Sequence, residues 1–393
     1  MKSDWMSKKF SEIAIFNPQE SIAKGTIAKK IAMDKLKPFC RDVPSFDLEK
    51  FSGGTKFRNG DTIMARITPC LENGKTAKVN ILDDGEVGFG STEYIVFRAN
   101  KGIDEDYIYY LTCSPLVREP AIKSMVGSSG RQRVQTDVLK DLSVMVPPLD
   151  EQKKISGILK TLDDKIELNN RINENLEQQL TAYYYELFVE QAHPDWKLGT
   201  IADLGNVVGG GTPSKKQSEY YTPSGIAWIT PKDLSNDHSK FIAHGENDIT
   251  ELGLSQSSAV LMPSGTVLFS SRAPIGYIAI ADGEVTTNQG FKSVVPYEHI
   301  GSAFVYYFLK DNLSVIENMA SGSTFKEISG STMRVVPAVI PDKGTISTFR
   351  ECSDSIFAYQ KILEAENKRL RNIRDVLLPQ LLSGSLDVSE VEV

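Results

Sequence analysis

The feature that most constrains this chain is an internal repeat. The 393 residues divide near their middle into two halves that carry the same succession of patterns, although few residues are identical. The matched segments are Trp5 and Trp196, YIYYL at 107–111 and FVYYF at 304–308, and GSSGRQRV at 127–134 and SGSTFKEI at 321–328. Each half then ends in a long polar segment with regularly spaced apolar residues. A repeat of this kind predicts two similar folded units.

The closing segments of both halves predict long helices. Residues 151–192 carry apolar residues spaced alternately by four and three, the heptad pattern of a helix that packs on another helix. The predicted pairing residues there are Ile155, Leu159, Leu162, Ile166, Leu176 and Leu180, with Asn169 and Asn173 on the same seam. Residues 344–393 carry a seventh-residue series, Phe349, Ile356, Leu363, Leu370 and Leu377, beside a mixed flank of Ser353, Gln360, Asn367 and Arg374. Neither helix is apolar all round, so we expect each to pair with the other, in a register that the sequence leaves open.

Two independent core helices are the alternative, but helices of this length are unusual inside one small domain. The rest of each half mixes short β-like runs, glycine-rich turns and one aromatic helix, which predicts an α+β fold. The predicted domains are a first lobe at 1–150, a central helix at 151–192, a second lobe at 193–343 and a C-terminal helix at 344–393. The predicted architecture is two globular lobes held apart by paired helices, with a pseudo-two-fold repeat.

Composition narrows the class of protein. Apolar residues make up 40% of the chain and charged residues 24%, which is typical of a folded soluble protein. No apolar run is long enough to cross a membrane and the N-terminus lacks a signal-peptide core, so we predict a cytoplasmic location. The four cysteines (Cys40, Cys70, Cys113 and Cys352) and the four histidines are scattered, which predicts neither a metal site nor a disulfide framework. A net charge of −7 argues against a general polyanion binder, although residues 1–60 carry a basic excess and residues 151–190 an acidic one.

Known catalytic motifs are incomplete in this sequence. Asn73–Thr76 resembles the end of a phosphate-binding loop, but Pro69 occupies the position of the leading glycine. Asn17–Glu20 lacks the second proline and the aromatic residue of an amino-methyltransferase loop. Pro341–Asp342 and Glu366–Lys368 fit the letters of a nuclease motif but fall at separate places on a predicted long helix. We therefore predict no catalytic centre and no metal site.

Polar loops in both halves carry side chains suited to DNA. Arginine can bond guanine O6 and N7 with two donors, glutamine can pair with adenine, and serine suits phosphates. The candidates in the first half are Ser128, Ser129, Arg131, Gln132 and Arg133. Those in the second half are Lys215, Lys216, Thr230, Lys232, Arg272, Asn288, Gln289, Lys292 and Lys326. Any one of them is as readily a solvated surface residue, but the whole set, in both halves and without a catalytic motif, favours DNA recognition.

Several of these segments resemble one known family. PPLDEQ…YYYELF at 147–188 and LRNIRDVLLPQLLSGSLDV at 370–388 resemble the conserved helical regions of type I restriction–modification specificity (S) subunits. GDTIMARITPCLENGKTA at 60–77 and VVGGGTPSKK at 207–216 resemble two varieties of that family's target recognition domain. The resemblance covers nearly the whole chain, and its helical segments are the most specific part.

The resemblance implies a DNA-specificity subunit without catalytic activity. In that family two target recognition domains each read one half of a split DNA sequence, and an antiparallel pair of long helices sets their separation. Two modification (methyltransferase) subunits dock on the helices and carry the S-adenosylmethionine, so no cofactor is expected in this chain; restriction subunits are a further partner. The family's DNA contacts lie in recognition-domain loops, which adds Arg66 and Lys75 to the candidates. A stand-alone methyltransferase or nuclease and a coiled-coil adaptor that binds only proteins remain as alternatives.

Overall fold

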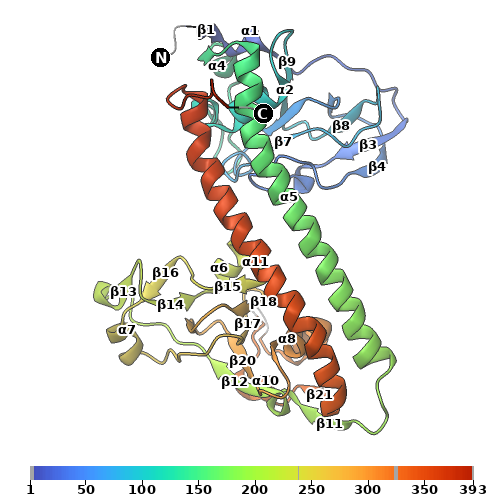
Figure 1. The fold of residues 1–393 in the computed structure, drawn as a ribbon, viewed down its shortest axis with the longest axis vertical. Helices are drawn as coiled ribbons and strands as arrows, with labels where there is room; N and C mark the ends of the chain where they lie inside the picture. The colour runs from blue at the N-terminus through green and yellow to red at the C-terminus, as the bar shows by residue number, and fades with distance from the viewer. Residues whose placement is uncertain (1–3, 238, 323–325, 392–393) are drawn as a thin grey trace. The chain divides into compact units, whose positions relative to one another are not determined.

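The computed structural model describes residues 4–237, 239–322 and 326–391 (Figure 1). His238 lies outside the described residues, and so do residues 323–325 of the repeated segment 321–328. The chain divides into two compact units. Unit 1 comprises Met1–Leu168 and Asn367–Val393, and unit 2 comprises Asn169–Glu366.

Unit 1 is built from short strands and helices that precede the first long helix. Its strands are β1 (Met6–Lys9), β2 (Ala14–Phe16), β3 (Ile27–Ile31), β4 (Asp47–Lys50), β5 (Thr55–Phe57), β6 (Thr62–Ala65), β7 (Thr76–Lys78), β8 (Gly88–Gly90), β9 (Tyr94–Ala99) and β10 (Ser143–Val146). Its shorter helices are α1 (Phe10–Ile13), η1 (Met33–Lys35), α2 (Glu105–Cys113), α3 (Pro115–Lys123) and α4 (Thr136–Lys140). The strands form sheets in the orders β2-β9-β6-β7, β4-β3-β8-β5 and β1-β10.

Unit 2 has the same kind of construction. Its strands are β11 (Lys197–Thr200), β12 (Gly205–Gly209), β13 (Tyr221–Thr222), β14 (Ile226–Ile229), β15 (Phe241–Ile242), β16 (Asn247–Ile249), β17 (Val267–Ser271), β18 (Ile275–Ala281), β19 (Val285–Thr287), β20 (Lys292–Pro296) and β21 (Pro337–Ile340). Its shorter helices are η2 (Glu186–Glu190), η3 (Ile201–Asp203), η4 (Ser218–Tyr220), α6 (Pro231–Asn236), α7 (Glu251–Ser255), α8 (Ser302–Asp311), α9 (Leu313–Met319) and α10 (Gly330–Arg334). The sheet orders are β12-β20-β17-β18-β15, β13-β16-β14-β19 and β11-β21.

The predicted repeat and the α+β class are confirmed by this topology. The order β2-β9-β6-β7 recurs as β12-β20-β17-β18, and the parallel pair β3 and β8 recurs as β14 and β19. The two matched tryptophans also make the same contact. Trp5 Nε1 donates to Glu151 Oε2 and Trp196 Nε1 donates to Asp342 Oδ2, each at 3.0 Å. Each indole thereby fixes the start of a long helix on the strand pair that precedes it.

The aromatic helices α2 and α8 form the centre of each unit's core. All but the terminal residues of both helices are largely buried, including Tyr107 and Phe304. Asp104 caps the start of α2 by accepting a hydrogen bond from the backbone N–H of Tyr107 at 2.8 Å. The aromatic helices therefore stabilise each unit through buried apolar area.

The two long helices are α5 (Leu149–Tyr185) and α11 (Lys343–Leu382). Gly384, with φ at +71°, follows the end of α11 in the left-handed conformation that glycine tolerates. In unit 1 the early part of α5 contacts the late part of α11, since Asp163 Oδ1 pairs with Arg374 Nη1 at 2.7 Å. In unit 2 the late part of α5 contacts the early part of α11, since Gln360 Nε2 donates to the Asn173 carbonyl at 3.3 Å. The helices thus pair in an antiparallel sense.

The contact face of α11 is more polar than its heptad series predicts. The mixed flank is buried. The exposed fractions of Ser353, Gln360, Asn367 and Arg374 are 0%, 2%, 2% and 8%. Among the predicted pairing residues, Ile155, Leu159, Ile166, Leu180, Phe349 and Leu363 are buried, and Leu162, Leu176, Ile356, Leu370 and Leu377 are half-buried. Asn169 is buried, and its amide donates to Glu366 Oε2 at 2.8 Å. A polar seam of this kind favours one register over others.

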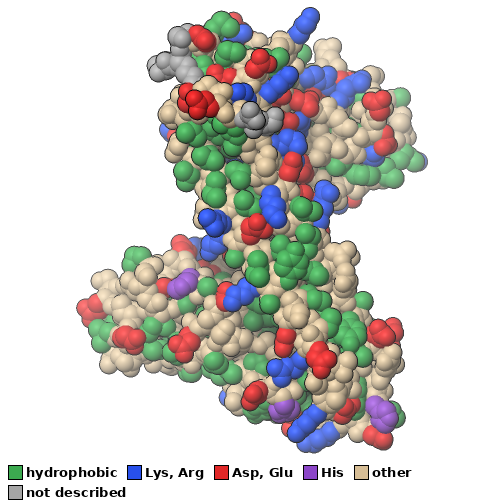
Figure 2. All heavy atoms as spheres, in the orientation of Figure 1, with side chains coloured by type: hydrophobic (Ala, Val, Ile, Leu, Met, Phe, Trp, Pro, Cys, Tyr) green, Lys and Arg blue, Asp and Glu red, His purple; other side chains and the backbone are tan. Residues whose placement is uncertain are grey.

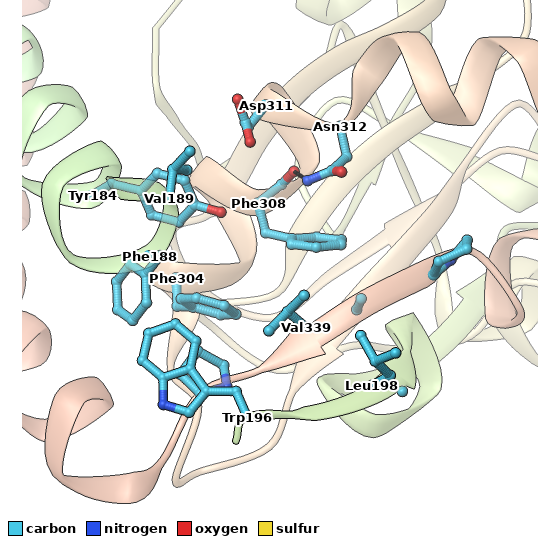
Figure 3. A pocket seen from close by; sticks show the side chains of 14 residues that line it. Tyr184, Phe188, Val189, Trp196, Leu198, Phe304, Phe308, Asp311, Asn312 and Val339 are labelled. Carbon is cyan, nitrogen blue, oxygen red and sulfur yellow. Dashed lines mark hydrogen bonds between the residues drawn. The ribbon is translucent and has the colours of Figure 1, made fainter. Parts of the chain in front are cut away.

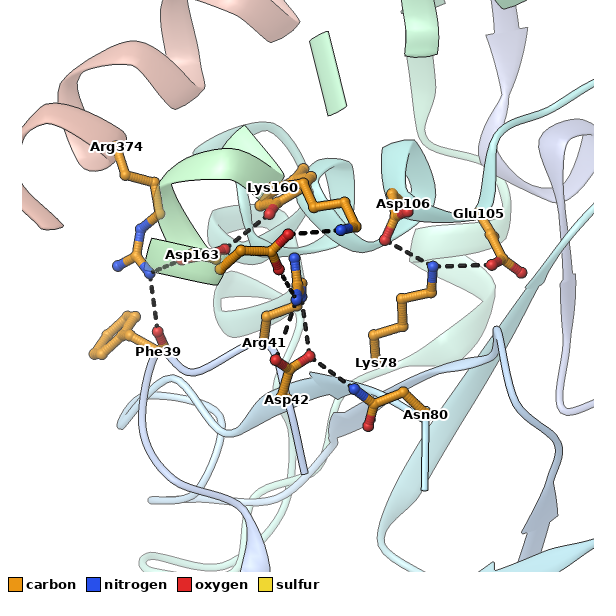
Figure 4. Close-up of polar contacts among 12 residues, drawn as sticks. Phe39, Arg41, Asp42, Lys78, Asn80, Glu105, Asp106, Lys160, Asp163 and Arg374 are labelled. Carbon is orange, nitrogen blue, oxygen red and sulfur yellow. Dashed lines mark hydrogen bonds and ion pairs between the residues drawn. The ribbon is translucent and has the colours of Figure 1, made fainter. Parts of the chain in front are cut away.

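Each unit also joins its aromatic helix to the long helices through a carboxylate. In unit 1, Asp163 accepts from Tyr110 Oη at 2.8 Å as well as from Arg374 (Figure 4). In unit 2, Glu177 pairs with Lys240 and accepts from Tyr307 Oη at 2.8 Å. Burial alone raises the pKa of Glu177, but Lys240 and Lys310 lower it to about 2.

No helix in the described part of the chain is long and apolar enough to cross a membrane.

Candidate nucleic-acid interface

The first candidate surface of unit 1 is a turn that begins where β6 ends. Arg66 and Thr68 lie beside the loop 126–134, because the Val134 N–H donates to the Arg66 carbonyl at 2.9 Å and the Thr68 N–H donates to the Gln132 carbonyl at 3.0 Å. The loop closes on itself through paired backbone bonds between Val126 and Arg133. We call residues 66–69 and 126–134 the bridged turn of unit 1.

Unit 2 contains the same construction where β17 ends. The Ile328 N–H donates to the Ser271 carbonyl at 3.1 Å, and Ser321 and Glu327 exchange paired backbone bonds. A proline lies three residues after Arg66 and three after Ser271, at Pro69 and Pro274. We call residues 271–274, 321–322 and 326–328 the bridged turn of unit 2. By these backbone bonds Arg133 and Glu327 occupy equivalent positions.

Charged side chains converge on the bridged turn of unit 1. Arg133 donates to Glu93 Oε1 twice, from Nη2 at 2.6 Å and from Nε at 3.0 Å. Arg66 Nε lies 3.7 Å from Glu93 Oε2. The Arg133 side chain is 44% exposed and that of Glu93 is 24% exposed. The hydrogen bond from Arg133 lowers the pKa of the Glu93 carboxyl. One carboxylate therefore holds two of the predicted DNA-binding arginines.

The bridged turn of unit 2 holds a similar group. Arg272 Nη1 donates to Glu327 Oε2 at 3.3 Å, and Lys292 Nζ lies 3.8 Å from Glu327 Oε1. Arg272 and Glu327 are each 39% exposed, whereas Lys292 is mostly covered and donates to two backbone carbonyls. Burial lowers the pKa of the Lys292 ammonium. In both units a carboxylate thus lies between two basic side chains.

The exposed tip of the unit 1 loop carries the other candidates of that half. Ser128, Ser129 and Arg131 are exposed and Gln132 is half-buried. The Arg131 N–H closes the tip by donating to the Ser128 carbonyl at 3.0 Å. These side chains therefore lie next to Arg133 on one short loop.

A polar cleft of about 400 Å³ brings together five of the unit 2 candidates. They are Lys215, Thr230, Lys232, Asn288 and Gln289, which line it with Thr212, Trp228, Glu246 and Asn247. The Thr230 hydroxyl donates to Asp233 Oδ2 at 2.6 Å at the start of α6, and Lys232 Nζ pairs with Glu246 at 2.7 Å. The Asn288 N–H donates to the Ile229 carbonyl at 3.0 Å, which fixes this segment at the end of β14.

The remaining candidates do not share that cleft. Lys75 Nζ donates to the Met33 carbonyl at 2.9 Å, so its ammonium is partly engaged within unit 1. Lys216 is exposed beside Lys215 but does not line the cleft. Lys326 is exposed next to Glu327 on the bridged turn of unit 2. The candidates of unit 2 therefore fall into two groups, one at the cleft and one at the turn.

Sequence reasoning missed the acidic members of these groups. Glu93, Glu246 and Glu327 each pair with a predicted DNA-binding cation. Glu93 and Arg133 are 40 residues apart, and no local pattern signals such a contact. On the face drawn in Figure 2, basic and acidic side chains are likewise interspersed.

A second cavity, of about 390 Å³, has a different character (Figure 3). Aromatic and aliphatic side chains line it, among them Phe188, Trp196 and Phe304, with Asp311 and Asn312 at its edge. Its apolar lining does not suit a phosphate or a base edge. Within the described residues, no group of three or more His, Cys, Asp or Glu side chains is placed to hold a metal ion.

Comparison with known proteins assigns the family. The model of the type I restriction modification DNA specificity domain matches this chain twice, at residues 2–178 and 194–372. The chain therefore belongs to the family of type I restriction modification specificity proteins, with one copy of the domain in each half.

Individual relatives carry related names. The HindI specificity subunit of Haemophilus influenzae is 26% identical over 407 residues, covering 84% of this chain and 87% of the relative. The MjaIX specificity subunit of Methanocaldococcus jannaschii is 39% identical over 183 residues, but this covers only 45% of this chain and 40% of that relative. The crystal structure of a type I restriction–modification S subunit from M. genitalium shares the fold, with a TM-score of 0.59, 16% identity and 96% of each chain covered.

Proposed function

We propose that this chain is the DNA-recognition subunit of a type I restriction–modification enzyme. Each unit binds one half of a bipartite DNA sequence, and α5 and α11 determine the spacing between the halves. The observation that carries the proposal is the match of one DNA specificity domain to both halves of the chain. The bridged turns support it, because both units have basic side chains at equivalent turns of the backbone.

The candidate residues have different roles in this proposal. Arg131, Gln132, Arg133 and Arg272 are the proposed contacts to bases, because their donors and acceptors match base edges. Lys215, Lys216 and Lys326 are exposed and are the proposed contacts to phosphates. The partly engaged Lys75 is a weaker candidate because Met33 already accepts one of its bonds.

The proposed protein partners are two modification subunits that dock on the long helices. In support, α11 exposes apolar side chains in both units, with Tyr359 at 46% and Ile362 at 62% in unit 2, and Val376 at 59% in unit 1. Tyr359 and Ile362, three residues apart, are neighbours on the surface of α11, and exposed apolar residues that adjoin one another are typical of protein contacts. The modification subunits hold the S-adenosylmethionine and perform the methyl transfer, and this chain has no catalytic role. A restriction subunit is a further proposed partner.

The test is to map methylated bases in DNA from cells that express this chain with its modification subunit. We expect one bipartite motif with a fixed gap, absent from cells that lack this chain. Titration of the isolated chain with S-adenosylmethionine in a calorimeter should give no specific heat. A continuous motif, or micromolar binding of S-adenosylmethionine by the chain alone, would contradict the proposal.

A further inference from the structure

The bridged turns each carry a group of two basic residues and one carboxylate, but a different element supplies the carboxylate in each unit. In unit 1 the loop supplies Arg133 and the segment before β9 supplies Glu93. In unit 2 the equivalent loop position is Glu327, and β20, whose place matches that of β9, supplies Lys292. The residues after β6 and β17 add Arg66 and Arg272. Each group thus has two basic residues around one carboxylate.

The carboxylate fixes the orientation of one guanidinium in unit 1. Nε and Nη2 of Arg133 face Glu93, with three contacts between 2.6 and 3.0 Å. A guanidinium has five donors in a rigid plane, so this grip leaves the Nη1–Nη2 edge directed away from the carboxylate. Within the described residues no hydrogen bond engages that edge, and the side chain is 44% exposed.

In unit 2 the exposed guanidinium is that of Arg272, which belongs to the segment after β17 and not to the loop. Arg272 contacts Glu327 through Nη1, while the mostly covered Lys292 binds the carbonyls of Gln289 and Phe291. Lys292 is therefore the covered cation beside Glu327, at 3.8 Å, and Arg272 is the accessible one. In unit 1 the second cation beside the carboxylate is Arg66, whose buried Nε lies 3.7 Å from Glu93 Oε2.

The chemistry of such a pair suits a base edge better than a phosphate. A carboxylate beside the arginine cancels part of the charge that attracts a phosphate, and it repels the phosphate directly. It leaves the geometry of two parallel donors unchanged, and guanine offers two matching acceptors, O6 and N7, in the major groove. Holding the side chain before binding also reduces the entropy lost on contact.

We infer that Arg133 and Arg272 each read one guanine and that Glu93 and Glu327 are the positioning residues that hold them. This inference rests on the proposed function and deepens it. It assigns one arginine–carboxylate pair to each half-site, so each half of the target contains a G·C pair that this arginine reads.

The test uses the full chain in complex with its modification subunit. The wild-type motif is first defined by selection from random DNA duplexes. Glu93→Ala should then lower discrimination at one G·C pair of one half-site by about tenfold. Binding to unrelated DNA should stay the same or increase, because a negative charge is removed. Glu327→Ala should do the same to the other half-site.

Two further variants separate positioning from a structural role. Glu49→Ala removes an exposed partner of Lys30 in the same unit and should leave both half-sites unchanged. Arg133→Lys keeps the charge but not the fork, so it should lose the same discrimination as Glu93→Ala and retain binding to unrelated DNA. This variant tests the reading of guanine even if loss of Glu93 destabilises unit 1.

The outcomes distinguish this inference from the proposed function. The inference is overturned, while the bipartite motif stands, if Glu93→Ala discriminates at the G·C pair within twofold of the wild type. It is also overturned if Arg133→Lys retains that discrimination. A parallel loss of binding to target and unrelated DNA in Glu93→Ala also overturns it, since that result indicates a structural role. A wild-type complex that selects no bipartite motif contradicts the proposed function, and the inference with it.

Discussion

Replacing Asp163 with leucine should destabilise unit 1 strongly. Asp163 and Arg374 pair at 2.7 Å between the long helices, and their side chains are 7% and 9% exposed. Asp163 also accepts the hydrogen bond of Tyr110, and Arg374 Nη1 donates to the Phe39 carbonyl at 3.2 Å (Figure 4). Removal of Asp163 leaves the buried guanidinium of Arg374 with the exposed Asp375, at 2.9 Å, as its remaining carboxylate, and takes the acceptor from Tyr110. Loss of one partner of a buried pair costs about 3–5 kcal/mol.

The double variant Asp163→Leu with Arg374→Met is the matched comparison. Loss of both charges leaves no buried charge without its buried partner, so the double variant should lie within about 1–2 kcal/mol of the wild type. Glu49→Ala, at the exposed pair with Lys30, should change stability by less than about 1 kcal/mol.

Hydrogen exchange followed by mass spectrometry measures the two units separately. Asp163→Leu should speed exchange in the core peptides of unit 1 by about two to four orders of magnitude, while peptides of unit 2 are little affected. Equal, small effects for the single and the double variant would contradict this prediction, because the buried pair would then carry no coupling energy.

Three other predictions follow from the helices and the exposed lysines. The pKa of Glu177 is lowered from 4.5 to about 2, so its stabilisation of unit 2 is complete above pH 4.5 and is lost as the pH falls towards 2. Acid unfolding curves of Glu177→Gln should therefore depend less on pH than those of the wild type. Insertion of four residues after Gln179 adds about 6 Å of helix and should lengthen the gap of the methylated motif by about one to three base pairs; an unchanged gap would show that the helices do not set the spacing. Lys215→Ala with Lys216→Ala should weaken binding to all DNA alike and reduce the salt dependence by about one to two charges, and an effect confined to one sequence would contradict a phosphate role.

Heptad spacing was enough to predict the two long helices, and the matched segments of the two halves were enough to predict the repeat. The heptad residues of 151–192 and the seventh-residue series from Phe349 lie on or beside the contact faces of α5 and α11. The register was not predictable, because it depends on which polar partners meet. Arg374 contacts Asp163 from 211 residues away, and nothing near either residue indicates the other.

The candidate site was predictable in residue type more than in arrangement. Exposed polar loops indicated Arg131, Arg133 and Lys215, and the structure gathers five unit 2 candidates at one cleft. The acidic partners were not predictable, since Glu93 reaches Arg133 only after β6, β9 and the loop 126–134 have come together. Tertiary pairing of this kind leaves no local sequence signal.

Variants confined to one unit test most directly whether each unit reads one half of a bipartite target. The measurement is the methylated motif in cells that express the modification subunit with wild type, with Arg131→Ala plus Arg133→Ala, or with Arg272→Ala. The first variant should relax one half-sequence and the second should relax the other, with the gap unchanged in both. Relaxation of both halves by either variant, or of the same half by both, would contradict it.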